Sequence, residues 1–198
     1  RVLDIGASSG LFLQALQKEF QAEGMGVEPG DAYRALAEEQ GLHMLPSLPE
    51  LIASRPQRFG LVSLMHVLEH LPDPVGVLRQ IREELLAPQG WLLLEVPNFY
   101  AHNSYELAHL SCFTPHTLQE ALSKAGYEII SLRQHGYPRS ELFKLYLNVL
   151  AQPSANPLTD YEVRPERAVP LKRSLAIAWR DLRARLDPKR SWLPAEEK

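Results

Sequence analysis

The feature that most constrains the fold is the start of the chain, where a short apolar run leads into a turn of small residues. Residues 2–5 read VLDI, glycine or serine follows at positions 6, 8 and 10, and a helical apolar pattern begins at Leu11. Small side chains let the backbone approach a ligand, and free N–H groups at a helix start favour an anionic group. A dinucleotide turn would read G-x-G-x-x-G, which this segment does not. The sequence predicts a ligand-binding strand, turn and helix in an α/β sheet.

Strand and helix patterns alternate along most of the chain, which favours an open, doubly wound α/β sheet. Strands are expected at Val2–Ile5, 25–28, 42–45, Phe59–Met65, 91–96, 127–132 and 143–149. Helices are expected at Leu11–Phe20, 31–40, Leu48–Ala53, 74–86 and Pro115–Lys124. Asp31 is expected to be an N-cap. The side chains that the first helix is expected to turn inward are Leu11, Ala15, Leu16 and Phe20.

The composition of the chain changes near Gln152, after which prolines punctuate a polar stretch and an arginine-rich amphipathic helix follows over 171–186. We therefore predict a domain over 1–151 and a Pro-rich linker with a basic helical extension over 152–198. Two interpretations of the helix stay open: it packs on the domain with its basic face in water, or that face meets an anionic substrate or partner. Because the chain begins in mid-strand, we expect a preceding segment to be missing.

Composition and charge limit the classes of partner. A 45% hydrophobic, 23% charged chain of 198 residues suffices for one sizeable core. The net charge of −3 gives no overall case for nucleic acid or an anionic membrane as partner. No apolar run reaches the roughly 20 residues that span a bilayer. The single cysteine, Cys112, excludes an intrachain disulfide and favours a reducing compartment, so we expect a cytoplasmic protein.

Candidate functional residues follow three of the predicted strands at their carboxyl ends, where open α/β sheets bind ligands. They are the turn over 4–10, Glu28 after the second strand, and the segment 63–70 after the fourth. Glu28 is placed to accept hydrogen bonds from both hydroxyls of a ribose. Its alternative role is that of an acid favourable to the dipole of the next helix.

Four segments resemble the class I S-adenosylmethionine-dependent methyltransferases: residues 2–10, GVEP at 26–29, HVLEH within 59–71, and 90–98. The likeness is to the branch with a VLEHLPDP segment, which includes ubiquinone-type O-methyltransferases and small-molecule and sugar methyltransferases. It covers residues 1–135. The resemblance implies a Rossmann-like, mostly parallel seven-stranded sheet whose last strand is antiparallel. It also implies S-adenosyl-L-methionine as cofactor and S-adenosyl-L-homocysteine as product.

The resemblance assigns cofactor contacts residue by residue. The turn over 4–10 would hold the methionine portion, Glu28 would hold the ribose hydroxyls and Pro29 would lie beside the adenine. Met65 and His66 would line the cofactor floor near the sulfonium. The full cofactor-binding set is Asp4, Gly6, Ala7, Ser8, Gly10, Glu28, Pro29, Met65 and His66.

Catalysis of methyl transfer mainly requires alignment of acceptor, methyl and sulfur and exclusion of water. A general base helps when the acceptor is a hydroxyl or a carbon acid. The candidates by type and location are His66, His109 and Tyr105. A supporting or capping role is the alternative for each histidine, and it is favoured for His70, which precedes a proline break.

The run H-x-x-E-H at 66–70 also spells an inverted zinc-protease motif. That chemistry needs both histidines one turn apart within a longer helix, and Pro72 and Pro74 interrupt any helix here. We therefore expect no metal.

The sequence thus predicts methyl transfer to a small-molecule acceptor at oxygen or carbon. The alternative is a catalytically weak or inactive cofactor-binding or regulatory module of the same fold. A nicotinamide enzyme comes third because its glycine spacing is absent. Exocyclic-amine methylation of DNA is disfavoured, since residues 64–67 read LMHV where such enzymes carry an Asn/Asp-Pro-Pro-aromatic run.

Overall fold

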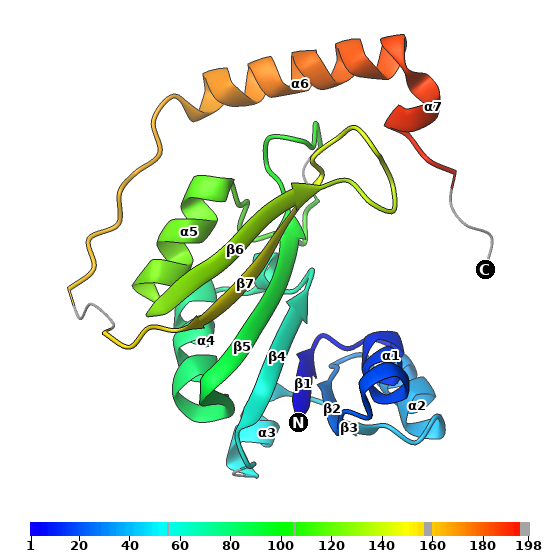
Figure 1. The fold of residues 1–198 in the computed structure, drawn as a ribbon, viewed down its shortest axis with the longest axis vertical. Helices are drawn as coiled ribbons and strands as arrows, with labels where there is room; N and C mark the ends of the chain where they lie inside the picture. Colours follow the sequence, from blue (N-terminus) through cyan, green and yellow to red (C-terminus); the bar gives the residue numbers. More distant parts are fainter. Residues whose placement is uncertain (55, 105, 157–159, 195–198) are drawn as a thin grey trace.

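The computed structural model describes residues 1–54, 56–104, 106–156 and 160–194, whose strands form a seven-stranded sheet (Figure 1). The strand order is β3-β2-β1-β4-β5-β7-β6. Pairs from β3 to β5 are parallel, and β7 runs antiparallel to both β5 and β6. This arrangement confirms the Rossmann-like sheet with an antiparallel last strand. The strands are β1 (Val2–Ile5), β2 (Gly24–Val27), β3 (His43–Leu45), β4 (Phe59–Met65), β5 (Leu86–Pro97), β6 (Tyr127–His135) and β7 (Tyr146–Pro153).

Helices cover both faces of the sheet, and the two larger of the three apolar cores of the described residues lie between these helices and the sheet. Successive side chains of a strand point to opposite faces, so Val2 packs in one core and Leu3 in the other. The smaller of these two cores lies under α1 (Leu11–Phe20) and α2 (Asp31–Glu39), and the larger one lies under the remaining helices of the domain. Those helices are α3 (Leu48–Ala53), α4 (Pro74–Gln80) and α5 (Pro115–Lys124).

The inward face of α1 differs from the expected one. Leu13 is buried and packs over Gly24 of β2, while Leu16 is half-buried. Leu11 is 58% exposed and Phe20 is 75% exposed, and Ala15 is exposed as well. Only Leu16 of the expected set therefore faces the sheet. Gly24 has no side chain and admits Leu13 closely, which sets the rotation of the helix about its axis.

Several element boundaries also differ from expectation. Gly30 occupies the N-cap position of α2, and Asp31 is its first residue, where it accepts a hydrogen bond from Arg34. The expected helix over 74–86 is split into α4 and a π-helix, Ile81–Leu85, after which Leu86 already begins β5. Strand β6 is longer than 127–132, and β7 begins later than 143.

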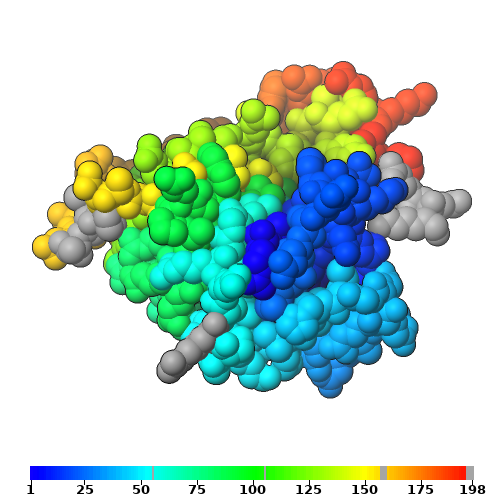
Figure 2. All heavy atoms as spheres, turned by 60° about the horizontal axis from the view of Figure 1, so that its bottom comes forward, coloured from blue at the N-terminus to red at the C-terminus, as the bar shows by residue number. Residues whose placement is uncertain are grey.

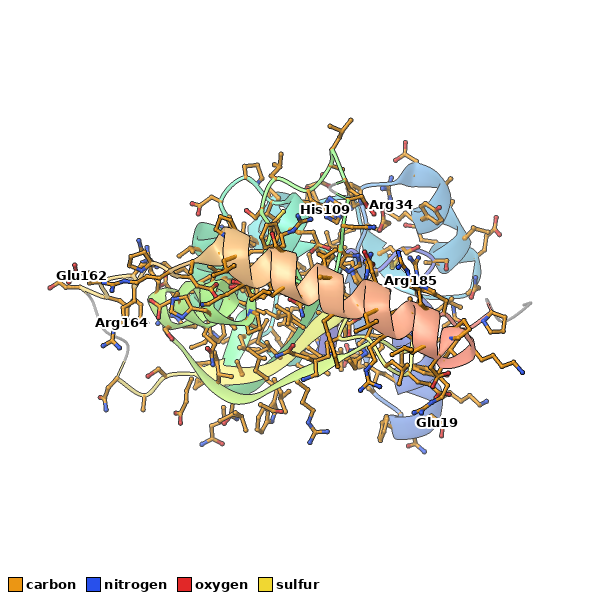
Figure 3. All side chains as sticks on the ribbon, turned by 90° about the horizontal axis from the view of Figure 1, so that it is seen from above. Glu19, Arg34, His109, Glu162, Arg164 and Arg185 are labelled. Atoms are coloured by element: carbon orange, nitrogen blue, oxygen red, sulfur yellow. The ribbon has the colours of Figure 1, made fainter. Side chains whose placement is uncertain are left out.

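The C-terminal segment crosses the sheet edge where the parallel strands end (Figures 1 and 3). Strand β7 extends to Pro153, so residues 152 and 153, assigned to the extension in the sequence analysis, belong to the sheet. Helices α6 (Val169–Leu186) and α7 (Pro188–Ser191) follow. Figure 2 looks at the opposite edge, where the dark-blue start of the chain lies in the middle and α6 shows only at the rim. Within the described residues, no helix has the length and apolarity to cross a bilayer.

Candidate functional site

The turn between β1 and α1 contains three residues with left-handed backbone: φ is +76° at Gly6, +49° at Ser8 and +78° at Gly10. A Cβ added to Gly6 would collide with Val67, and one added to Gly10 would collide with Leu42. Both glycines are therefore required for space as well as for conformation. Ser8 adopts the same conformation with a side chain, which is unfavourable for an L-residue. The two-residue spacing in the sequence thus corresponds to alternating left-handed positions.

Glu28 follows β2 and joins the two turns at the carboxyl ends of β1 and β2. Its Oε2 accepts a hydrogen bond from the backbone N–H of Ser8 at 2.9 Å, and its Oε1 accepts one from Gly30 at 2.7 Å. A carboxylate oxygen can accept two hydrogen bonds, so each oxygen keeps further acceptor capacity. The neighbouring Pro29 is exposed. Glu28 is therefore fixed beside the small-residue turn, as the order of the sequence features requires.

Asp4 is the buried acid of this edge, with 4% of its surface exposed. Its Oδ1 accepts a hydrogen bond from Ser63 Oγ of the adjacent strand β4 at 2.7 Å. Burial raises the pKa of Asp4 to about 6, the hydrogen bond from Ser63 opposes that rise, and the nearby charge of Glu28 adds to it. Two carboxylates, Asp4 and Glu28, thus place negative potential at one end of the turn, which favours a cationic group there.

His66 follows Met65 at the end of β4 and has a left-handed backbone, with φ of +57°. Its Nδ1 lies 3.5 Å from Glu69 Oε1, and its Nε2 lies 3.2 Å from Glu95 Oε1. The carboxylates of Glu69 and then Glu95 raise the pKa of His66 to about 9, against the opposing effect of burial. The ring is therefore an imidazolium at neutral pH. A group in that state cannot accept a proton.

Glu95, on β5, contacts His66 and two further side chains, and the sequence analysis did not identify it. Its Oε2 also lies 2.8 Å from His135 Nε2 and accepts a bond from Asn148 Nδ2 at 3.3 Å. Burial alone would raise the pKa of Glu95, but the bonds from His66, His135 and Asn148 hold it below its ordinary value. The signal that could have found it is a lone charge within the apolar run 91–96.

Glu69 is 1% exposed, and neither of its carboxylate oxygens has a hydrogen-bond partner within the described part of the chain. One ligand atom from each of Glu69, His70 and His109 lies within 4.8 Å of the other two. His70 Nδ1 is 3.0 Å from the carbonyl of Ala108, consistent with the expected supporting role, and its ring meets that of His109 edge to face.

These three side chains could ligate a divalent cation, whereas His66, which contacts both Glu69 and Glu95, is not part of this group. The helical zinc-protease arrangement of His66 and His70 does not form, because Leu68–His70 is only a 3₁₀ turn. The expectation of a metal-free site stays a prediction, which elemental analysis of the purified protein would check.

A cavity of about 320 Å³ lies at the same edge, walled by the ends of β4 and β5 and by the irregular segment 98–112. His66 and His109 both line it, so two of the three predicted catalytic residues share one cavity. His109 Nε2 is 3.2 Å from Glu106 Oε2. The third, Tyr105, lies outside the described residues. Further wall residues are Glu69, His70, Phe99, His102, Cys112, Arg139 and Tyr146.

The linker before α6 is anchored to this segment through Glu166, which no sequence signal singled out. Its carboxylate accepts hydrogen bonds from Tyr100 Oη at 2.6 Å, Thr114 Oγ1 at 2.5 Å and Lys172 Nζ at 2.8 Å. Although burial would raise the pKa of Glu166, these bonds lower it to about 2. Thr114 is also the N-cap of α5, as expected. The linker is thus tied to the element that closes the cavity.

Comparison with known proteins gives a family and several relatives. A protein family described as "Methyltransferase domain" matches residues 1–132. The ubiquinone biosynthesis O-methyltransferase of Nitrosospira multiformis is 32% identical over 107 residues, which are 49% of this chain and 43% of the relative. The enzyme of the same name from Serratia proteamaculans is 34% identical over 104 residues, which are 49% of this chain and 42% of the relative. The chain spans less than half the length of these curated relatives.

Solved structures share the fold at low identity. A SAM-dependent methyltransferase from Archaeoglobus fulgidus superposes with a TM-score of 0.63 and 19% identity, covering 77% of this chain and 85% of that one. A [4+2]-cyclase superposes with a TM-score of 0.61 and 16% identity, covering 79% and 76%. At these identities the likeness establishes the fold and leaves the reaction open.

Proposed function

The chain belongs to the class I family of S-adenosylmethionine-dependent methyltransferase domains, and on this premise we propose that it methylates an oxygen or carbon atom of a small molecule. The observation that carries the proposal is the pair of carboxylates, Asp4 and Glu28, beside a turn with left-handed small residues. The O-methyltransferase relatives support oxygen as the acceptor atom. The net charge of −3 supports a small molecule over nucleic acid.

The donor set fits S-adenosylmethionine, the cofactor of this family. The cofactor carries a sulfonium, an ammonium group and a ribose diol, which suit two carboxylates. Glu28 keeps acceptor capacity for the diol after its bonds to Ser8 and Gly30. We assign the methionine portion to Asp4, Gly6, Ala7, Ser8 and Gly10, the ribose to Glu28, the adenine to Pro29, and the cofactor floor to Met65 and His66.

When bound, the cofactor supplies a methyl group that needs little activation, so the chain mainly aligns the acceptor and excludes water. The cavity beside His66 and His109 is our acceptor site. His109, paired with Glu106, is the general base in this proposal, with Tyr105 as the second candidate. His66 acts as a fixed cation at this edge, since its pKa of about 9 leaves it protonated. We place the reaction in the cytoplasm, in keeping with the free, exposed thiol of Cys112.

A second candidate is a cofactor-binding or regulatory module of the same fold without efficient turnover. The strained backbone of Ser8 within the binding turn favours it, and the [4+2]-cyclase neighbour illustrates how the fold serves another reaction.

Calorimetry with S-adenosylmethionine tests the cofactor assignment. We expect Glu28→Gln to weaken binding at least about tenfold, because it removes a charged hydrogen-bond acceptor. Glu38→Gln, an exposed acid on α2, is the matched control and should bind as wild type does. Equal affinity of Glu28→Gln and wild type for S-adenosylmethionine would overturn the assignment of Glu28. A wild-type protein that does not bind S-adenosylmethionine would refute both candidate functions.

Release of S-adenosylhomocysteine across a panel of phenols, catechols and carbon acids tests the reaction. We expect His109→Gln to keep cofactor affinity and to lower turnover about 100-fold, as for loss of a general base. Cofactor binding without turnover on any acceptor would favour the module.

A further inference from the structure

Helix α6 turns its polar arginines, and not its leucines, toward the domain. Arg173 Nη2 donates to the carbonyl of His102 at 2.7 Å, and Arg180 Nη1 donates to that of Ala101 at 2.9 Å. The half-buried residues of the helix recur at intervals that mark its inner face: Val169, Arg173, Ala176, Ile177, Arg180 and Ala184. A helix that simply packed on the domain would bury its apolar face. The helix therefore contacts the domain, as in the first interpretation, but two of its arginines lie on the inner face and its leucines are exposed to solvent.

The outer face of α6 is an apolar stripe, which we define as Leu171, Leu175, Trp179, Leu182 and Leu186. Their exposed fractions are 61%, 63%, 59%, 48% and 71%. Their spacing of four, four, three and four residues puts them along one side of the helix. Figures 1 and 3 show α6 at the outermost part of this edge of the molecule. The helix thus presents the apolar stripe to solvent throughout its length.

Basic residues flank the apolar stripe. Lys172 and Arg183 lie on one side of it and Arg185 on the other, by the 100° rotation per residue of an α-helix. Residues 169–192 contain seven lysines and arginines and two aspartates, a net charge of +5 in a chain whose net charge is −3. Trp192, 49% exposed, continues the aromatic character beyond α7. A net charge of +5 is therefore concentrated around the exposed apolar stripe.

We propose that the apolar stripe of α6 docks on an anionic lipid bilayer. A helix with leucine and tryptophan on one side and lysine and arginine along its flanks lies in the headgroup region of such a surface. A second copy of the chain is disfavoured as the occupant, because it would bring two regions of charge +5 together. Since Arg173 and Arg180 hold the cavity segment at residues 101–102, docking also brings the cavity to the bilayer. The proposal does not depend on methyl transfer.

Co-sedimentation of the protein with vesicles of phosphatidylglycerol and phosphatidylcholine tests the docking surface. We expect binding that weakens with added salt and with removal of phosphatidylglycerol. The double variant Leu175→Gln, Leu182→Gln should bind at least about tenfold more weakly, since it removes two apolar side chains that the bilayer would bury. The matched control is Leu36→Gln, Ile130→Gln, which changes two residues of 47% and 49% exposure on α2 and β6 and should bind as wild type does.

Three results would overturn the proposal. The first is wild-type protein that stays in solution with these vesicles at low salt. The second is undiminished vesicle binding by the Leu175, Leu182 variant. The third is a wild-type dimer in sedimentation equilibrium that the same variant dissociates, since a second copy would then cover the apolar stripe. Urea unfolding of both double variants shows that they fold, so that loss of binding reports on the surface.

Discussion

The charge on buried Asp4 should reduce the stability of this protein at neutral pH, and Asp4→Asn measures by how much. Burial raises the pKa of Asp4 from 3.8 to about 6, so the folded state binds its proton more tightly than the unfolded state does. Stability from this group is therefore greatest below pH 3.8 and is lost as the pH rises through 6. Each pKa unit corresponds to about 1.4 kcal/mol, so the loss is about 3 kcal/mol.

Asparagine keeps the shape of the side chain and an oxygen that can accept from Ser63, but it carries no charge. A neutral acceptor makes a weaker bond to Ser63 Oγ than a carboxylate does, which costs about 1 kcal/mol. We therefore expect Asp4→Asn to raise the free energy of unfolding by about 2 kcal/mol at pH 8. At pH 4 the advantage should disappear, because wild-type Asp4 is then neutral as well. The decisive quantity is the change in the difference between the two proteins, about 2 kcal/mol from pH 4 to pH 8.

Urea unfolding followed by tryptophan fluorescence across this pH range provides the measurement. Asp160→Asn, a change at an exposed acid, is the control and should leave the unfolding free energy unchanged. A difference between Asp4→Asn and wild type that does not vary with pH would refute the reasoning. We also expect Asp4→Asn to bind S-adenosylmethionine more weakly. The acid would then be retained for cofactor binding at the expense of stability.

Three further predictions follow from the same contacts. Ser8→Gly should stabilise the fold by about 1 kcal/mol in urea unfolding, because relief of the left-handed strain exceeds the added flexibility of the unfolded chain; a destabilised variant would contradict this. Glu166→Gln should lower the free energy of unfolding by about 1–3 kcal/mol and speed amide hydrogen exchange at the start of α6. This loss should shrink as the pH falls from 4.5 toward 2, where wild-type Glu166 is protonated, and unchanged exchange would count against the anchor. Glu95→Gln should lower the pKa of His66 below about 9 in an NMR titration, and an unchanged pKa would contradict the contribution of Glu95.

The sequence predicted the parts of the site that depend on local backbone. Gly6 and Gly10 had to be small because their positions are left-handed and tightly surrounded, and that requirement is visible in a single short segment. Glu28 was found for the same reason, since it directly follows a recognisable strand. The alternation of strand and helix indicated the sheet, because the crossovers from β1 to β2, from β2 to β3 and from β4 to β5 each connect neighbouring parallel strands.

The rotation of α1 about its axis and the start of β5 were predicted less well, because they depend on residues distant in the chain. The rotation of α1 follows from the space above Gly24, which periodicity within the helix does not contain. Likewise, Leu86 joins β5 by pairing with Phe59, so the strand begins before residue 91, where it was expected to start. In both cases an interaction across strands outweighed a local turn or helix preference.

The functional groups that sequence reasoning missed share a different cause: each works through residues from several elements. Glu95 contacts His66, which follows β4, His135 of β6 and Asn148 of β7, so its role exists only once the antiparallel strand β7 has inserted between β5 and β6. Its position therefore links the end of β4, where the family motif lies, to strands that the motif does not cover. Variation in β6 and β7 can then alter the charge state of His66 without any change in the motif itself.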